Sequence, residues 1–143
     1  MTTSQTSARP ADTAGRVAAA RPLRMFLALD AAVTAGNGLI YLLFAGPVGD
    51  LLGLDTGLLR GIGAFLTVYG ILVAALATRP VPAAGPTKVV IEANLLWAVA
   101  SVATAVFGWF DPDTVGTVWI LMQAAVVGGF AVLQINGLRR LGS

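Results

Sequence analysis

An apolar run long enough to cross a membrane carries polar side chains in its interior. In residues 27–44, LALDAAVTAGNGLIYLLF, these include the carboxylate of Asp30 and the amide of Asn37. A carboxylate at the centre of a membrane helix costs on the order of 2.5 to 3.5 kcal/mol, so such residues face other helices or water and are often functional. Asp30 therefore suits either proton exchange or burial in protonated form with hydrogen bonds to other helices.

Other polar residues in the apolar segments fall into two layers when their depth is counted along the expected helices at about 1.5 Å per residue. The layer about 10 Å or less from the cytoplasmic end comprises Asp30, Glu92, Asn94 and Gln134, although Glu92 and Asn94 point in nearly opposite directions on their helix. The central layer, about 20 Å from that end, comprises Asn37, Thr67, Ser101 and Gln123. At 100° per residue, Asp30, Thr34, Asn37 and Tyr41 share one helix face, which predicts a polar bundle interior.

These groups also have a purely structural interpretation. Amides and hydroxyls in membrane helices commonly hydrogen-bond neighbouring helices, at about 0.6 kcal/mol each. For Asp30, whose burial costs more, a functional and a structural role stay equally open. Glu92 follows Lys88 by four residues, so we expect an ion pair between them at the membrane surface.

Composition excludes much of known enzymology. The chain has no histidine and no cysteine, which removes imidazole and thiolate metal sites, His-ligated haem, disulfides and Ser-His or Cys-His catalysis. No catalytic motif occurs, so we expect no cofactor and no metal, and enzymatic activity is not expected. Hydrophobic residues make up 57% of the 143 residues and charged residues 11%, against about 25% charged in soluble domains. The mean hydropathy of +0.82 identifies a membrane protein.

Four apolar segments, each about 20 residues long, are separated by Gly, Pro, Asp and Arg. They are residues 23–44, 58–78, 89–110 and 115–138. Each is long enough to cross the hydrocarbon core as a helix, and the bilayer requires each segment to satisfy its own backbone. The sequence predicts an all-α membrane protein, a four-helix antiparallel transmembrane bundle over residues 23–138.

The basic residues predict the orientation. Eight of the nine Arg and Lys residues fall on one side, and only Arg60 lies on the other. Both termini should therefore be cytoplasmic. Residues 1–22 are small, polar and basic and are expected to form a disordered cytoplasmic tail, favoured over a signal peptide because no cleavage site is evident. Residues 139–143 form the cytoplasmic C-terminal end.

Small residues mark where helices should approach closely. Gly63, Gly70 and Ala74 form a seam on the second segment. Between the first two segments, the loop of residues 46–57, GPVGDLLGLDTG, has apolar residues spaced for a short amphipathic turn on the outer surface.

The order of elements resembles a known group. The loop AGPVGDLLGLDTG followed by LLRGIGAFLTVYGILVAALATR, with Arg60 before a Gly-rich helix, is similar to small bacterial four-helix membrane proteins of the loose DoxX-like group. This resemblance covers roughly residues 23–138. It implies a helical bundle, and for some members an association with quinone-linked oxidation. The Ala-, Gly-, Val- and Arg-rich composition is similar to that of proteins from high-GC bacteria, which implies the bacterial inner membrane.

Three functions follow as hypotheses. The first is a small structural or accessory bundle, whose partners are the lipid bilayer and either another membrane protein or a second copy of the chain. The second is a proton-coupled exporter that uses Asp30 as its membrane carboxylate. The third is a redox-associated membrane subunit of the DoxX-like type. Nucleic acid is not an expected partner, since the basic residues flank apolar runs.

Overall fold

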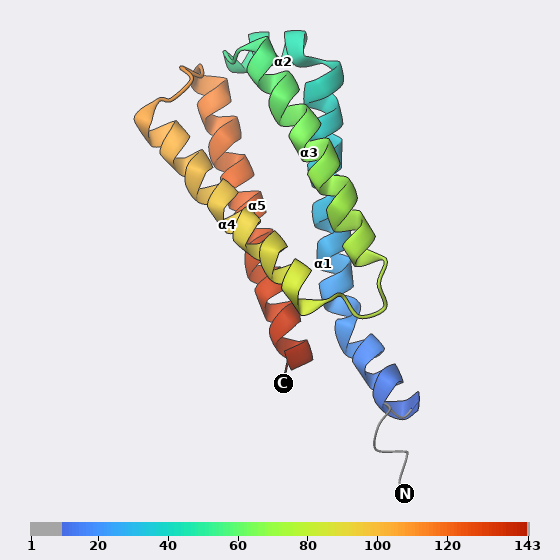
Figure 1. Ribbon diagram of the computed structural model, residues 1–143. Helices are drawn as coiled ribbons and strands as arrows, with labels where there is room; N and C mark the ends of the chain where they lie inside the picture. Colours follow the sequence, from blue (N-terminus) through green and yellow to red (C-terminus); the bar gives the residue numbers. More distant parts are fainter. Residues whose placement is uncertain (1–9, 143) are drawn as a thin grey trace, which may run out of the picture.

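The computed structural model describes residues 10–142, and this part of the chain is almost entirely α-helical. The helices are α1 (Pro10–Leu43), α2 (Ala45–Leu52), α3 (Thr56–Ala77), α4 (Ala84–Phe107) and α5 (Thr114–Gly142). No strand occurs within these residues. The four long helices run antiparallel, so α1 begins and α5 ends at the same end of the bundle (Figure 1). The predicted all-α four-helix membrane fold is confirmed.

Four helices, α1, α3, α4 and α5, are long and apolar enough to cross a membrane. Large apolar side chains cover the outside, where Phe65 is 55% exposed and Leu96 is 70% exposed, whereas Asp30 is 1% exposed and Gln134 is fully buried. A protein folded in water has the opposite distribution, because burial of apolar surface drives its folding. The chain is therefore a multi-pass membrane protein whose apolar surface faces lipid.

Helix α1 begins at Pro10, before the predicted start at Leu23. The prediction of a disordered tail is wrong for residues 10–22, while residues 1–9 lie outside the described part of the chain. Two causes are visible: alanine favours helix, and α5 extends far enough for Leu138 and Leu141 to pack against the core cluster that contains Leu23. Pro22 lies inside the helix, where it removes one backbone donor without ending it.

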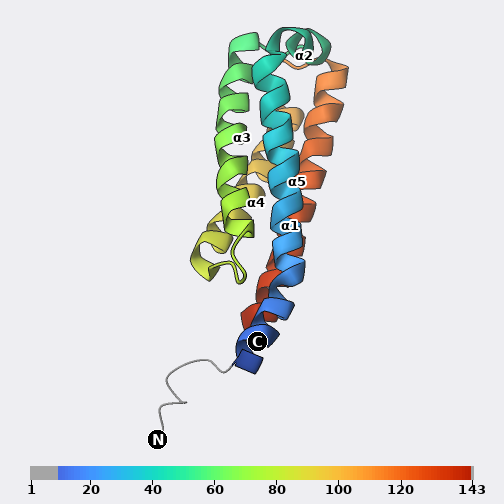
Figure 2. The ribbon, with the colours of Figure 1, turned by 90° about the vertical axis from the view of Figure 1, so that its right-hand side faces the viewer.

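The loop of residues 46–57 contains a helix. Helix α2 covers one end of the bundle (Figure 2) and is amphipathic, since Leu52 is 3% exposed and Leu51 is 60% exposed. It ends at Gly53, whose φ of 70° is left-handed and suits glycine. Helix α3 follows at once because the Asp55 carboxylate accepts a hydrogen bond from the Leu58 backbone N–H, 3.0 Å.

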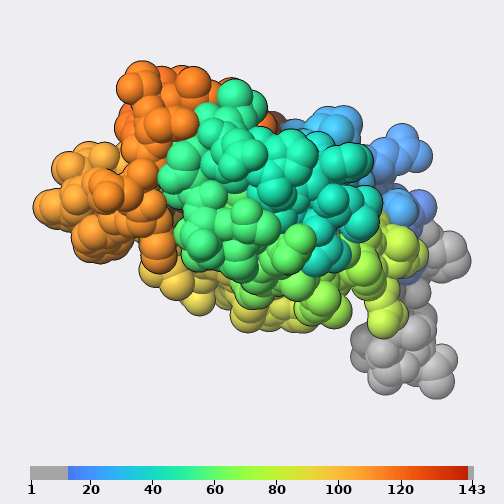
Figure 3. All heavy atoms as spheres, turned by 90° about the horizontal axis from the view of Figure 1, so that it is seen from above, coloured from blue at the N-terminus to red at the C-terminus, as the bar shows by residue number. Residues whose placement is uncertain are grey.

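The long helices form two pairs, and the backbones of α3 and α4 come close at few positions, so these two helices meet mainly through long side chains. The α1–α3 pair is the most extensive, and its seam is so close that a Cβ on Gly70 would lie 2.7 Å from the backbone nitrogen of Ala35. Gly63 packs equally closely on Gly38, whereas Ala74 is exposed at the lipid-facing edge of the seam. From the end that α2 covers, residues of the α4–α5 turn project beyond α2 and α3 (Figure 3). The bundle is thus tightly packed along α1–α3 and open between α3 and α4.

Candidate functional site

The carboxylate of Asp30 is the centre of a buried hydrogen-bond network. Its Oδ2 accepts from Asn94 Nδ2 at 2.8 Å and from Gln134 Nε2 at 2.7 Å, and its Oδ1 accepts from Thr34 Oγ1 at 2.9 Å. Asn94 Nδ2 also lies 3.0 Å from Gln134 Oε1. Three helices, α1, α4 and α5, therefore meet at one carboxylate, in the layer that depth counting assigned to these residues.

Tyr69 adds the fourth helix to this network. Its hydroxyl lies 3.1 Å from Asn94 Oδ1 and 3.2 Å from the carbonyl oxygen of Val90. Because both neighbours are acceptors, the hydroxyl proton can donate to either, and Asn94 is held at both ends of its amide. We call Asp30, Thr34, Tyr69, Asn94 and Gln134 the Asp30 network.

Asp30 is sealed by its hydrogen-bond partners and is satisfied without a counter-ion. Asp30, Asn94 and Gln134 are all at least 97% buried, and within residues 10–142 no basic side chain pairs with Asp30. Three neutral donors compensate the loss of water around the carboxylate. The Thr34 hydroxyl can also accept, so an uncharged side chain of the same shape would find a partner at every position. The arrangement is that of a structural hydrogen-bond centre.

The predicted central polar layer, Asn37, Thr67, Ser101 and Gln123, contains fewer hydrogen bonds between helices than the Asp30 network. Asn37 Nδ2 donates to Gln123 Oε1 at 3.2 Å, which joins α1 to α5. Thr67 donates to the Gly63 carbonyl of its own helix at 2.7 Å and does not bridge to another helix through that bond. Ser101 is half-buried and belongs to neither the pair nor the Asp30 network.

A cavity of about 280 Å³ lies between the two polar layers. Asn37 and Gln123 line it, and so do Thr34, Tyr69 and Asn94 of the Asp30 network, but Asp30 and Gln134 do not. Aromatic rings make much of the wall, with Phe65 stacked between Tyr69 and Trp97 at centroid distances of 5.9 and 6.1 Å. Its exposed lining residues include Phe65 on α3 and Leu96 on α4, so the cavity opens between these helices, toward lipid.

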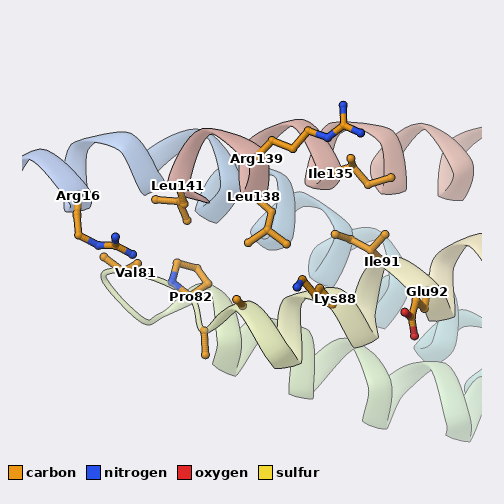
Figure 4. Close-up of a pocket in the computed structure, with 12 residues that line it drawn as sticks. Arg16, Val81, Pro82, Lys88, Ile91, Glu92, Ile135, Leu138, Arg139 and Leu141 are labelled. Atoms are coloured by element: carbon orange, nitrogen blue, oxygen red, sulfur yellow. The ribbon is translucent and has the colours of Figure 1, made fainter. Parts of the chain in front are cut away.

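One further expectation concerns the charged groups Lys88 and Glu92. The Lys88–Glu92 ion pair is not formed, and Figure 4 shows the two side chains pointing apart. Both are exposed, so water satisfies each charge without a partner. Within residues 10–142 no group of three or more acidic, His or Cys side chains could hold a metal ion.

Two hydrogen-bonding side chains, Tyr69 and Trp119, were not predicted from the sequence. Tyr69 lies eight residues before the end of α3 at Ala77, which is about 12 Å at the helical rise, so the depth argument that grouped Asp30 with Asn94 could have included it. Trp119 Nε1 donates to the Tyr41 hydroxyl at 2.6 Å and joins α5 to α1 near the end of the bundle that α2 covers.

Comparison with known proteins adds no assignment: no family model, curated protein or solved structure matches the chain.

Proposed function

We propose that the chain is a small structural or accessory bundle of the bacterial inner membrane. The observation that supports this most is the sealing of Asp30, which has three neutral hydrogen-bond donors and 1% exposure. A carboxylate that exchanges protons needs a path to water, whereas one that holds helices together needs only its partners. On this proposal the Asp30 network fixes the arrangement of all four transmembrane helices.

The outer surface supports an accessory role. A shallow groove between α1 and α3 exposes small side chains to lipid, among them Ala28, Ala32 and Ala74. Small residues let the backbone of another transmembrane helix approach closely, and van der Waals packing then drives association. The partner would be another membrane protein or a second copy of this chain.

A proton-coupled exporter is the second candidate, and one observation favours it. Thr34 and Asn94 both line the cavity of about 280 Å³ and both bond Asp30. A rotation of either side chain would connect the carboxylate to the cavity. The redox-associated role implied by the DoxX-like resemblance is retained as a third proposal, although the chain contains no histidine or cysteine for such chemistry.

Proton uptake by proteoliposomes tests the first proposal against the second. The purified protein and its Asp30→Asn variant would be reconstituted into vesicles that contain a pH-sensitive dye, and the external pH would then be lowered. We expect both proteins to acidify the lumen no faster than protein-free vesicles. Proton influx that depends on Asp30 would contradict the structural proposal and would favour the proton-coupled exporter.

Thiol labelling tests the proposed orientation in the bacterial inner membrane. The chain has no cysteine, so single cysteines at Ser4 and Asp113 report opposite sides without background. In intact cells a membrane-impermeant reagent should label the Asp113→Cys variant only, since the basic residues gather at the end that holds both termini. Labelling of Ser4→Cys from outside would reverse the assignment.

A further inference from the structure

A second cavity, of about 690 Å³, lies at the end of the bundle where α1 begins and α5 ends. Its lining comes from the first turns of α1, the loop between α3 and α4, the start of α4 and the end of α5 (Figure 4). It shares no lining residue with the cavity beside the Asp30 network. Its occupant must therefore be sought independently of Asp30.

The rim of this cavity is basic. Arg16, Lys88 and Arg139 line it, and Glu92 is the only acid among the lining residues. All three basic side chains are exposed, and none forms an ion pair within residues 10–142. Figure 4 shows Arg16 and Lys88 reaching the cavity from different helices. The site therefore offers unpaired positive charge to an anion.

The wall of the cavity is apolar. Ile91 of α4 and Leu138 of α5 point toward one another across it (Figure 4), and Ile135 and Leu141 extend the same surface along α5. A small inorganic anion would leave this surface uncovered. An amphiphile with a negative headgroup and an acyl chain matches both the rim and the wall.

The depth of the cavity matches the headgroup region of the bilayer. Lys88 precedes Asn94 of the buried network by six residues, which is about 9 Å along α4. The basic rim thus lies toward the water on the side that the distribution of Arg and Lys assigns to the cytoplasm. Basic pockets between transmembrane helices on this side bind anionic lipid headgroups.

We propose that this cavity binds an anionic phospholipid, with its phosphate between Arg16 and Lys88 and an acyl chain along Ile91, Ile135 and Leu138. The two basic groups supply charge from separate helices, so the lipid would join the start of α1 to the start of α4. The apolar wall gives the chain a surface continuous with the bilayer. The site recognises the negative charge of the lipid headgroup and does not require a particular group esterified to the phosphate.

Native mass spectrometry of the protein in micelles that contain equal amounts of phosphatidylglycerol and phosphatidylcholine tests the proposal. The unaltered protein should retain phosphatidylglycerol preferentially. The Arg16→Gln and Lys88→Gln variants should each reduce that preference about fivefold, and the double variant about 25-fold, since each basic group near the lipid acts nearly independently. Lys88→Arg retains the charge and should preserve the preference.

Arg79→Gln is the matched control, because Arg79 lies on the same side but does not line this cavity. It should leave the preference unchanged, and all variants should share the helical content of the unaltered protein. Equal retention of the two lipids, or an equal loss in Arg79→Gln, would overturn the proposal. Displacement of the lipid by millimolar inorganic phosphate would also overturn it, since the site would then recognise a free anion.

Discussion

Each of the two polar layers of the bundle contains a side chain from the same face of α1, Asp30 in one and Asn37 in the other, but these side chains lie in different environments. Asp30 and Asn37 are seven residues apart and point in nearly the same direction. Asp30 is sealed within a network that includes all four long helices, whereas Asn37 has one hydrogen-bond partner and borders a cavity. Helix phase alone therefore does not decide whether a polar side chain is buried.

The difference follows from the packing of the helix pairs. The seam of Gly63 and Gly70 packs α1 closely against α3, whereas the backbones of α3 and α4 come close at few positions. Tyr69 spans this interface at the level of Asp30 by reaching Asn94. At the level of Asn37, Thr67 donates its hydrogen bond to its own helix. No polar side chain of α3 therefore bonds to the Asn37–Gln123 pair, and the cavity that these two residues line stays open between α3 and α4.

Replacing Asp30 by leucine should lower the free energy of unfolding more than any other substitution in either polar layer. Asp30→Leu leaves the Gln134 amide buried without its acceptor and removes one of the two acceptors of the Asn94 amide, and each buried N–H left unsatisfied costs about 1 to 3 kcal/mol. We expect the free energy of unfolding in detergent to fall by about 3 kcal/mol, measured by tryptophan fluorescence during denaturation. A loss no larger than that of a lipid-facing substitution would mean that the network does not hold the helices together.

A substitution that forces α1 and α3 apart should cause the second largest loss of stability. In Gly70→Leu the new side chain meets the backbone of Ala35, and the helices must separate at a cost of about 2 kcal/mol. Leu72→Ala, at a position that is 63% exposed, is the control and should change the melting temperature little. Equal melting temperatures of the two variants would count against the seam.

Removing the Tyr69 hydroxyl should have a smaller effect. Tyr69→Phe keeps the ring stacked on Phe65 but leaves Asn94 Oδ1 without its donor, so unfolding should become easier by about 1 kcal/mol. The comparison is with Phe65→Leu, which removes the ring stacked on Tyr69 but none of the hydrogen bonds of the Asp30 network. If Tyr69→Phe melts like the unaltered protein, the link between α3 and α4 through Asn94 has no energetic role.

The central layer should tolerate substitution best. Gln123→Leu removes the bond to Asn37 next to a cavity that can admit other groups, so we expect a loss of only about 0.6 kcal/mol in the same assay. The double variant with Asn37→Leu should cost no more than the sum. A loss as large as that of Asp30→Leu would erase the distinction between the two layers.

Sequence reasoning recovered the fold and part of the polar interior because two simple quantities govern them. The length of the apolar segments, and the Gly, Pro, Asp and Arg residues between them, predict four membrane helices. The constant rise per residue of a helix then places Asp30, Asn94 and Gln134 at one depth. Tyr69 was not among the predicted polar residues, although its position eight residues before the end of α3 places its hydroxyl at a similar depth. Sequence reasoning placed the start of α1 too late, since burial of Ala20 and Leu23 depends on how far α5 extends.

Other features depend on tertiary geometry that no local pattern contains. The separation of α3 from α4 creates the cavity, and it follows from which helices pair most closely, not from the composition of either helix. The expected Lys88–Glu92 pair satisfied the four-residue spacing but is absent, because exposed charges gain little from pairing.

The Asp30→Asn variant tests most directly whether Asp30 serves as a hydrogen-bond centre. Asparagine can present its carbonyl oxygen to Asn94 and Gln134 and donate from its amide to the Thr34 hydroxyl, so every bond has a replacement. The account predicts that the free energy of unfolding of Asp30→Asn lies within about 1 kcal/mol of that of the unaltered protein and well above that of Asp30→Leu. Equal destabilisation by the two substitutions would show that the negative charge itself is required, and would contradict the account.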